Sequence, residues 1–173
     1  MKDKIINELK KNKRTGIEKL IEWLESTDFF TAPASTRFHS NKNGGLAEHS
    51  WHVYTLLKEK NERFKLSLSE ETVILTGLLH DCCKTNTYSA NSKGKYPFIK
   101  DDPFPFGHGE KSVLLISKFI DLTVEECLMI RWHQSQGDYE WKRNIDEVSK
   151  ITSAVMALVT ADIEACAFLE LTK

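Results

Sequence analysis

The chain has 173 residues, of which 40% are hydrophobic, and its 24 Lys and Arg residues nearly balance its 25 Asp and Glu residues. This length and apolar content predict one domain with a core of its own. The formal charge of -1 excludes a global attraction to nucleic acid or to acidic membranes. The charged N-terminus lacks a secretory apolar segment, and no run approaches the roughly 20 apolar residues that cross a bilayer. We therefore expect a cytoplasmic protein with no membrane partner.

Apolar residues recur with a period near 3.6 along the chain, and helix-breaking residues fall between these runs. The pattern predicts a mainly α-helical domain, in which Ser69 is the N-cap of a helix with two acidic residues in its first turn. The predicted helices cover residues 2–11, 16–26, 46–60, 69–80, 110–119, 123–133 and 145–171.

Two stretches lack the helical period, residues 31–45 and residues 84–109. The second contains a Lys93-Gly94 turn between Tyr88 and Tyr96 and is compatible with a small β-hairpin. Loops this long inside a compact domain often cover or line a binding site.

The segment GLLHDCCK, Gly77 to Lys84, ends an apolar run on the adjacent polar residues His80 and Asp81. Burying an imidazole or a carboxylate without a partner costs several kcal/mol, so this pair predicts something bound. His49 lies on the apolar stripe of the helix predicted at 46–60, and Asp162 lies on that of the last predicted helix. A buried aspartate also needs a cation or several donors.

Two further histidines stand near helix ends, His108 before one predicted helix and His133 at the end of another. Taken singly, a core histidine is more often a hydrogen-bonding residue than a metal ligand. Taken together, four histidines and two aspartates can supply nitrogen and oxygen ligands to a divalent metal, with Mn, Fe, Zn, Ni and Mg left open. Such a metal would hold a hydroxide near neutral pH, and two metals would clamp an attacking water and a phosphate oxygen.

The ordered set of His49, the His80-Asp81 pair and Asp162 resembles the H…HD…D signature of HD-domain metal-dependent phosphohydrolases, over residues 32–165. The segments GGLAEHSWHV, GLLHDCCK and GHGEKS are similar to segments of the HD domain of certain bacterial 3′-to-5′ exoribonucleases. The resemblance implies an all-α HD-domain helical bundle that spans residues 1–173 as a single domain, with N-terminal helices in residues 1–31. The GYP motif of cyclic-di-GMP phosphodiesterases and the OB-fold of the exoribonucleases are missing from this chain.

Carried over by position, the resemblance implies two metal ions per chain, which Asp81 bridges as the central catalytic residue. The implied metal ligands are His49, His80, Asp81, His108, His133 and Asp162. Lys84 matches a lysine that the family places near the substrate phosphate, which makes it a second catalytic and a substrate-binding candidate. Arg37 and His39, on the loop before the first metal-binding helix, and Lys111, beside His108, are further substrate-binding candidates.

From this resemblance we expect a metal-dependent phosphohydrolase that cleaves a phosphate ester or anhydride of a small phosphorylated molecule, first of all a nucleotide, by attack of a metal-bound hydroxide. One alternative is a 3′-to-5′ exonuclease or phosphodiesterase acting on short RNA or DNA. The other is a non-catalytic module that binds a nucleotide or a metal. The sequence leaves the oligomeric state open.

Overall fold

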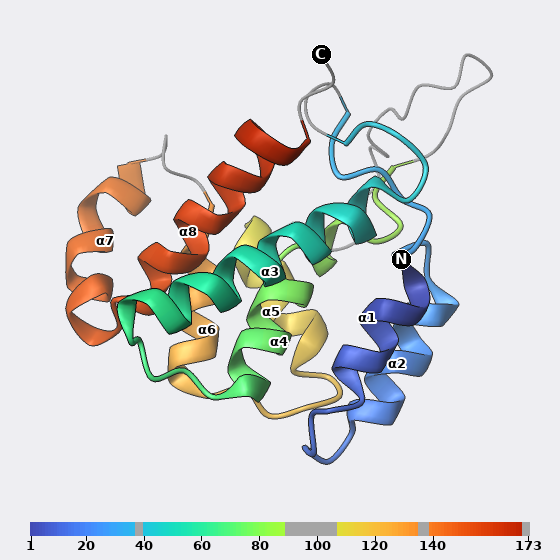
Figure 1. The fold of residues 1–173 in the computed structure, drawn as a ribbon, viewed down its shortest axis with the longest axis horizontal. Coiled ribbons are helices and arrows are strands. Elements are labelled where there is room, and N and C mark those ends of the chain that lie inside the picture. Colours follow the sequence, from blue (N-terminus) through green and yellow to red (C-terminus); the bar gives the residue numbers. More distant parts are fainter. Residues whose placement is uncertain (37–39, 89–106, 135–138, 171–173) are drawn as a thin grey trace.

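All elements in the part of the chain that the structure describes are helices, which confirms the predicted all-α class (Figure 1). The structure, a computed structural model, describes residues 1–36, 40–88, 107–134 and 139–170. The helices are α1 (Lys2–Leu9), α2 (Ile17–Ser26), α3 (Gly45–Phe64), α4 (Glu70–Leu79), the 3-10 turn η1 (Cys82–Lys84), α5 (His108–Ile116), α6 (Val124–Trp132), α7 (Tyr139–Ile151), α8 (Ala154–Glu164) and the π-helical segment η2 (Ala165–Leu169). The Lys93-Gly94 turn of the predicted hairpin lies outside the described residues.

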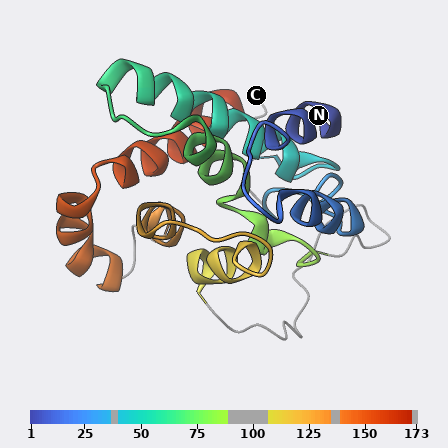
Figure 2. The ribbon, with the colours of Figure 1, turned by 90° about the horizontal axis from the view of Figure 1, so that it is seen from below.

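Four helices form a closed ring of contacts at the centre of the fold: α3 packs on α4, α4 on α6, α6 on α8, and α8 back on α3. The long helix α3 crosses the middle of the molecule, with the pair α1 and α2 at one end and α7 at the other (Figure 1). The view from below shows α5 beside α6 on the side away from α3 (Figure 2). Each helix of the ring carries at least one of the predicted metal ligands on itself or on the residues that end it.

Two apolar clusters hold these helices together. The larger one extends from α1 to α8 and contains fully buried leucines on α1, α2, α3, α4 and α8. The smaller one lies under α7 and contains Trp132, Ile145, Val148, Val155 and Val159. Full burial of one such aliphatic side chain stabilises the fold by about 1.5 to 3 kcal/mol, so these clusters contribute strongly to the stability of the ring.

Side-chain caps fix where two helices of the ring begin. The Ser69 hydroxyl accepts the Thr72 amide hydrogen at 3.0 Å, as the sequence predicted. Thr123 and Glu126 form a capping box at the start of α6, in which each side chain accepts the other residue's amide hydrogen. These caps satisfy amide donors that have no partner inside the helix, and so they set the residue at which α4 and α6 begin.

The long final helix predicted for residues 145–171 is wrong, because the chain turns between α7 and α8. The Thr152 hydroxyl donates to Glu125 Oε1 at 2.7 Å and accepts from the Ala154 amide at 3.2 Å. The second contact satisfies a free amide at the start of α8, and the first ties the turn to α6. The apolar periodicity runs through this break because both helices bury a face against the same cluster.

Two glycines allow helices of the site to approach each other closely. A Cβ atom on Gly77 would lie 2.7 Å from Tyr54 Cα, and one on Gly109 would lie 2.3 Å from the Arg131 carbonyl oxygen. Both distances are too short for a side chain. The two glycines therefore bring α4 against α3 and α5 against α6, and so set the spacing between the histidines of those helices.

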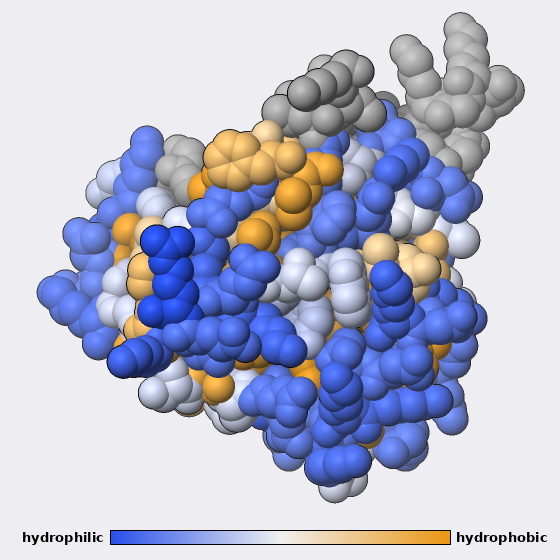
Figure 3. Space-filling model, viewed as in Figure 1, coloured by the Kyte–Doolittle hydropathy of each residue, from blue (hydrophilic) through white to orange (hydrophobic). Residues whose placement is uncertain are grey.

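Hydrophilic side chains cover most of the face seen in Figure 3, and apolar ones gather over the C-terminal end of α8. There Ile163, Phe168 and Leu169 are exposed. Among the described helices, none combines the length and the apolar character needed to span a membrane.

Candidate metal centre

The C-terminal ends of α4 and α6 each direct a histidine into the ring in the same way. His80 and His133 are the C-cap residues of these helices. His80 Nδ1–H donates to the Gly77 carbonyl at 2.9 Å, and His133 Nδ1–H donates to the Ile130 carbonyl at 2.6 Å. Carbonyls in the last turn of a helix lack helical partners, so these contacts are favourable. Because a carbonyl only accepts, Nδ1 carries the proton and the Nε2 lone pair of a neutral ring is left for another partner.

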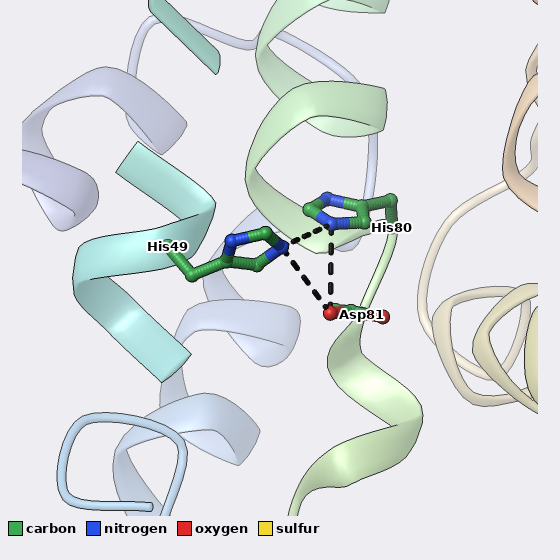
Figure 4. Close-up of side chains that lie close together, drawn as sticks. All are labelled: His49, His80 and Asp81. Atoms are coloured by element: carbon green, nitrogen blue, oxygen red, sulfur yellow. Dashed lines mark hydrogen bonds and ion pairs between the residues drawn. The ribbon is translucent and has the colours of Figure 1, made fainter. Parts of the chain in front are cut away.

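His49, His80 and Asp81 form the first group of potential ligands (Figure 4). His49 Nε2 lies 3.2 Å from His80 Nε2 and 3.5 Å from Asp81 Oδ2, and His80 Nε2 lies 3.6 Å from the same oxygen. All three residues are buried. Two ring nitrogens that face each other cannot both donate, so at least one lone pair points at the other ring.

Asp81, His108 and His133 form a second group on the other side of the same carboxylate. His108 Nε2 makes a short contact with Asp81 Oδ1, and His133 Nε2 lies 3.5 Å from that oxygen. Asp81 thus directs Oδ2 to the first group and Oδ1 to the second. It is the one residue that these two groups share.

Asp162 approaches from α8 and completes the first group. Its Oδ1 lies 3.1 Å from His49 Nε2 and accepts a hydrogen bond from the Cys166 thiol at 3.7 Å. Together His49, Asp162 and Cys166 make a third set whose ligand atoms converge. The structure therefore brings all six sequence-predicted ligands to one centre, from helices α3, α4, α5, α6 and α8.

The two facing imidazoles have opposite pKa shifts, because carboxylate neighbours outweigh burial at His49 whereas burial dominates at His80. Burial alone would lower the pKa of His49, but hydrogen bonds to Asp162 and Glu170 outweigh it and raise this pKa to about 9. Burial dominates at His80 and lowers its pKa to about 3. Burial would raise the pKa of Asp81, yet the Lys84 ammonium and the nearby imidazoles hold it well below its usual range.

In these protonation states, the Nε2 proton of His49 points to the place between the ligand atoms where a metal ion would bind. At neutral pH His49 is protonated and donates Nε2–H toward Asp162, while His80 is neutral with its lone pair directed at His49. A divalent cation bound by both Nε2 atoms and the two carboxylates would displace the His49 proton, as metal binding to histidine generally does. The donor set of buried imidazoles and carboxylates therefore fits a divalent metal.

The substrate-binding candidates lie in different places. Lys84, at the end of η1, is buried and its Nζ lies 2.6 Å from Asp81 Oδ2, so it is no solvated surface lysine. This carboxylate outweighs the effect of burial and raises the pKa of Lys84. Lys111 is a partly exposed residue in the first turn of α5, three residues after His108. Arg37 and His39 lie outside the described residues.

Besides Cys166, sequence reasoning did not single out Cys83 and Glu170, which also touch predicted ligands. Cys83 has its Sγ 3.2 Å from His108 Nδ1. Glu170 accepts hydrogen bonds from His49 Nδ1 at 3.0 and 3.2 Å. In a regular helix Glu170 would be turned by about 80° from Asp162, eight residues earlier, but a π segment absorbs one residue and reduces this to about 20°. Only the irregular segment η2 gives the two acids one face, and periodicity does not reveal it.

Comparison with known families gives one match. The sequence model of a family described as the HD domain matches residues 46–155. Nothing among curated proteins or solved structures matches the chain significantly. The matched range contains His49, His80, Asp81, His108 and His133, whereas Asp162 and Glu170 follow it.

Proposed function

The chain belongs to the HD domain family, whose members are generally metal-dependent phosphohydrolases, and from this premise we propose that it hydrolyses a phosphate ester or anhydride of a small phosphorylated molecule. Nucleotides are the first substrate class to test. The observation that carries the proposal is Asp81, whose two oxygens face two separate histidine pairs. A carboxylate in that position is suited to bridge two metal ions.

The proposed metals are two divalent transition-metal ions per chain. One would be held by His49, His80, Asp81 and Asp162, and the other by Asp81, His108 and His133. Four imidazoles against two carboxylates favour Fe, Mn, Zn or Ni over Mg²⁺, which prefers oxygen ligands. When bound, such a pair supplies a nucleophilic hydroxide and stabilises charge on the phosphoryl oxygens.

The residues of the chain have distinct proposed roles around this centre. The helix-end carbonyls of Gly77 and Ile130 hold His80 and His133 in the tautomer whose Nε2 can bind metal. Lys84 neutralises part of the Asp81 charge and offers an ammonium to a substrate phosphate close to the metals. Lys111 is a second, more exposed cation on the side of His108.

The test combines metal analysis with product analysis. Protein purified without chelator is expected to contain two equivalents of metal, or to take up two equivalents of Mn²⁺ or Fe²⁺ under anaerobic conditions. The loaded protein is then assayed on nucleoside mono-, di- and triphosphates and on short oligonucleotides. Release of inorganic phosphate from nucleotides supports the proposal, and release of mononucleotides from oligomers would point instead to an exonuclease or phosphodiesterase.

Two outcomes would overturn the proposal. A protein that takes up no metal removes the basis of the site. A protein that binds metal and nucleotide tightly but turns over no phosphorylated compound would be a binding module.

A further inference from the structure

We propose that Glu170 is a positioning residue of the metal centre, which holds His49 with its Nε2 directed at the metal. The inference rests on the proposed function, because it assigns a residue to the same site. Glu170 lies beyond the residues that match the family, at the end of the π segment that follows α8.

The contacts of Glu170 all come from hydrogen donors in segments far away in the sequence. Its Oε1 lies 3.0 Å from both His49 Nδ1 and His52 Nδ1, and its Oε2 accepts from the Ser40 hydroxyl at 3.0 Å. The Glu170 side chain is only 1% exposed. Burial would raise its pKa, but the hydrogen bonds from the two histidines outweigh this and hold it well below the usual range. Glu170 therefore accepts hydrogen bonds from three donors.

The Nδ1–H acceptor of His49 lies outside its own helix, unlike those of His80 and His133. His80 and His133 donate to carbonyls of their own helices, three residues back. His49 lies within the first turns of α3, where its Nδ1–H meets a carboxylate from the other end of the chain. A carboxylate behind a metal-bound imidazole fixes the ring orientation and makes the ring a stronger ligand. His52, three residues along the same helix face, holds Glu170 from the side.

A residue that only tied the C-terminus to α3 would act on stability alone, so the experiment measures two properties of His49. The first is the His49 Nδ1–H resonance in metal-free protein labelled with ¹⁵N-histidine. The second is the dissociation constant for Mn²⁺, measured by calorimetry. The variants are Glu170→Ala, the conservative Glu170→Gln, which keeps the shape and one acceptor oxygen, and the control Glu164→Ala. Glu164, the last residue of α8, is a carboxylate six residues earlier that pairs with Lys60 instead.

We expect Glu170→Ala to weaken Mn²⁺ binding by about 10- to 100-fold and to make the His49 Nδ1–H exchange faster with water. Glu170→Gln should lie between this variant and wild type, and Glu164→Ala should match wild type in both measurements. Wild-type Mn²⁺ affinity in folded Glu170→Ala or Glu170→Gln would overturn the inference and leave the proposed function intact. A wild-type protein that takes up no metal would overturn the proposed function, while the Nδ1–H resonance would still report whether Glu170 holds His49.

Discussion

Asp81 and Glu126 are two carboxylates whose side chains are at most 2% exposed, yet the groups around them differ in kind. Glu126 accepts two hydrogen bonds from the Arg14 guanidinium, each at 2.7 Å, and further ones from the Thr123 amide and the Thr72 hydroxyl. Every one of these partners brings its own proton. The chain by itself fully satisfies this charge.

Asp81 is surrounded mainly by imidazoles, and at least two of these, His80 and His133, have their Nδ1 protons directed at backbone carbonyls. Lys84 contributes an ammonium, whose Nζ lies 2.6 Å from Asp81 Oδ2. The comparison teaches that burial alone does not mark a functional carboxylate. The mark is a buried carboxylate that faces imidazole nitrogens, because a divalent cation can bind both kinds of ligand atom at once.

The largest expected effect follows from removing the charge of Asp81. Asp81→Asn keeps the shape but offers a neutral amide to both ligand groups. We expect loss of both metals and a fall in kcat/KM of about a thousandfold or more, equivalent to about 4 kcal/mol of transition-state stabilisation. Metal analysis and steady-state kinetics check this, and circular dichroism should show nearly unchanged helical content. Asp146→Asn, on the exposed face of α7, is the control. Two retained metals in Asp81→Asn would contradict the bridging role.

The opposite behaviour is expected when the partner of Glu126 is removed. Arg14→Met leaves a buried carboxylate without its guanidinium, and we expect the free energy of unfolding to fall by about 3 kcal/mol. That value is at the lower end for buried pairs because the Arg14 side chain is 20% exposed. Urea unfolding measures it. Metal content should stay at the wild-type value, and a loss of metal in the folded variant would break the distinction between the two carboxylates.

The same variant has a pH dependence with a definite sign. Burial would raise the pKa of Glu126, but the hydrogen bonds from Arg14, Thr123 and Thr72 outweigh it and lower the pKa below the ordinary 4.5. A carboxylate with a lowered folded-state pKa stabilises the fold above its unfolded pKa, and this contribution is lost as the pH falls. The stability difference between wild type and Arg14→Met should therefore be largest near pH 7 and shrink below about pH 4.5. A difference that grows on acidification would contradict this account.

A substitution with a smaller expected effect distinguishes the two proposed metal sites. His108→Ala removes a ligand from the second group only. We therefore expect the metal content to fall from two equivalents toward one, while the metal held by His49 and His80 stays bound. Elemental analysis of protein loaded with Mn²⁺ is the measurement, and His133→Ala should behave alike. Full occupancy in His108→Ala would remove this histidine from the ligands.

Lys84 is expected to matter for turnover more than for metal binding. Lys84→Met keeps the buried stem but removes the ammonium next to Asp81, and we expect kcat/KM to fall about ten- to a hundredfold, or about 1.4 to 2.7 kcal/mol. Removing the Lys84 ammonium should not weaken metal binding, because this positive charge repels a metal cation bound at Asp81. Kinetics and a Mn²⁺ titration of the same preparation test both halves. An unchanged kcat/KM would limit Lys84 to neutralising Asp81.

The smallest effect is expected at the outer partner of Arg14. Glu71 Oε2 lies 3.4 Å from Arg14 Nε, and its side chain is 33% exposed. Exposed pairs of this kind contribute about 0 to 1 kcal/mol, so Glu71→Gln should change the free energy of unfolding by less than about 1 kcal/mol. A loss as large as that of Arg14→Met would mean that the guanidinium is held from outside instead of by Glu126.

Much of the fold was predictable because helix periodicity and caps are local properties. The apolar stripes of α3 and α8 revealed His49 and Asp162, since a polar residue inside such a stripe stands out. The break at Thr152 was not predictable, because it depends on a contact with Glu125 on another helix. Lys84 was singled out by the family resemblance alone, and its 2.6 Å contact with Asp81 was not predictable from helix periodicity.

The π segment between Ala165 and Leu169 makes the site sensitive to the length of the chain at this point. Deleting one of its residues would let an ordinary α-helix continue without strain, and Glu170 would stay about 20° from Asp162, because seven residues make nearly two helical turns. Adding one residue that continues as α-helix would instead turn every following side chain by about 100°, and the Glu170 carboxylate would leave His49 although no residue of the centre had been substituted. A one-codon insertion here should therefore resemble a point mutation in the site, whereas a one-codon deletion and substitutions at the exposed Phe168 should be tolerated.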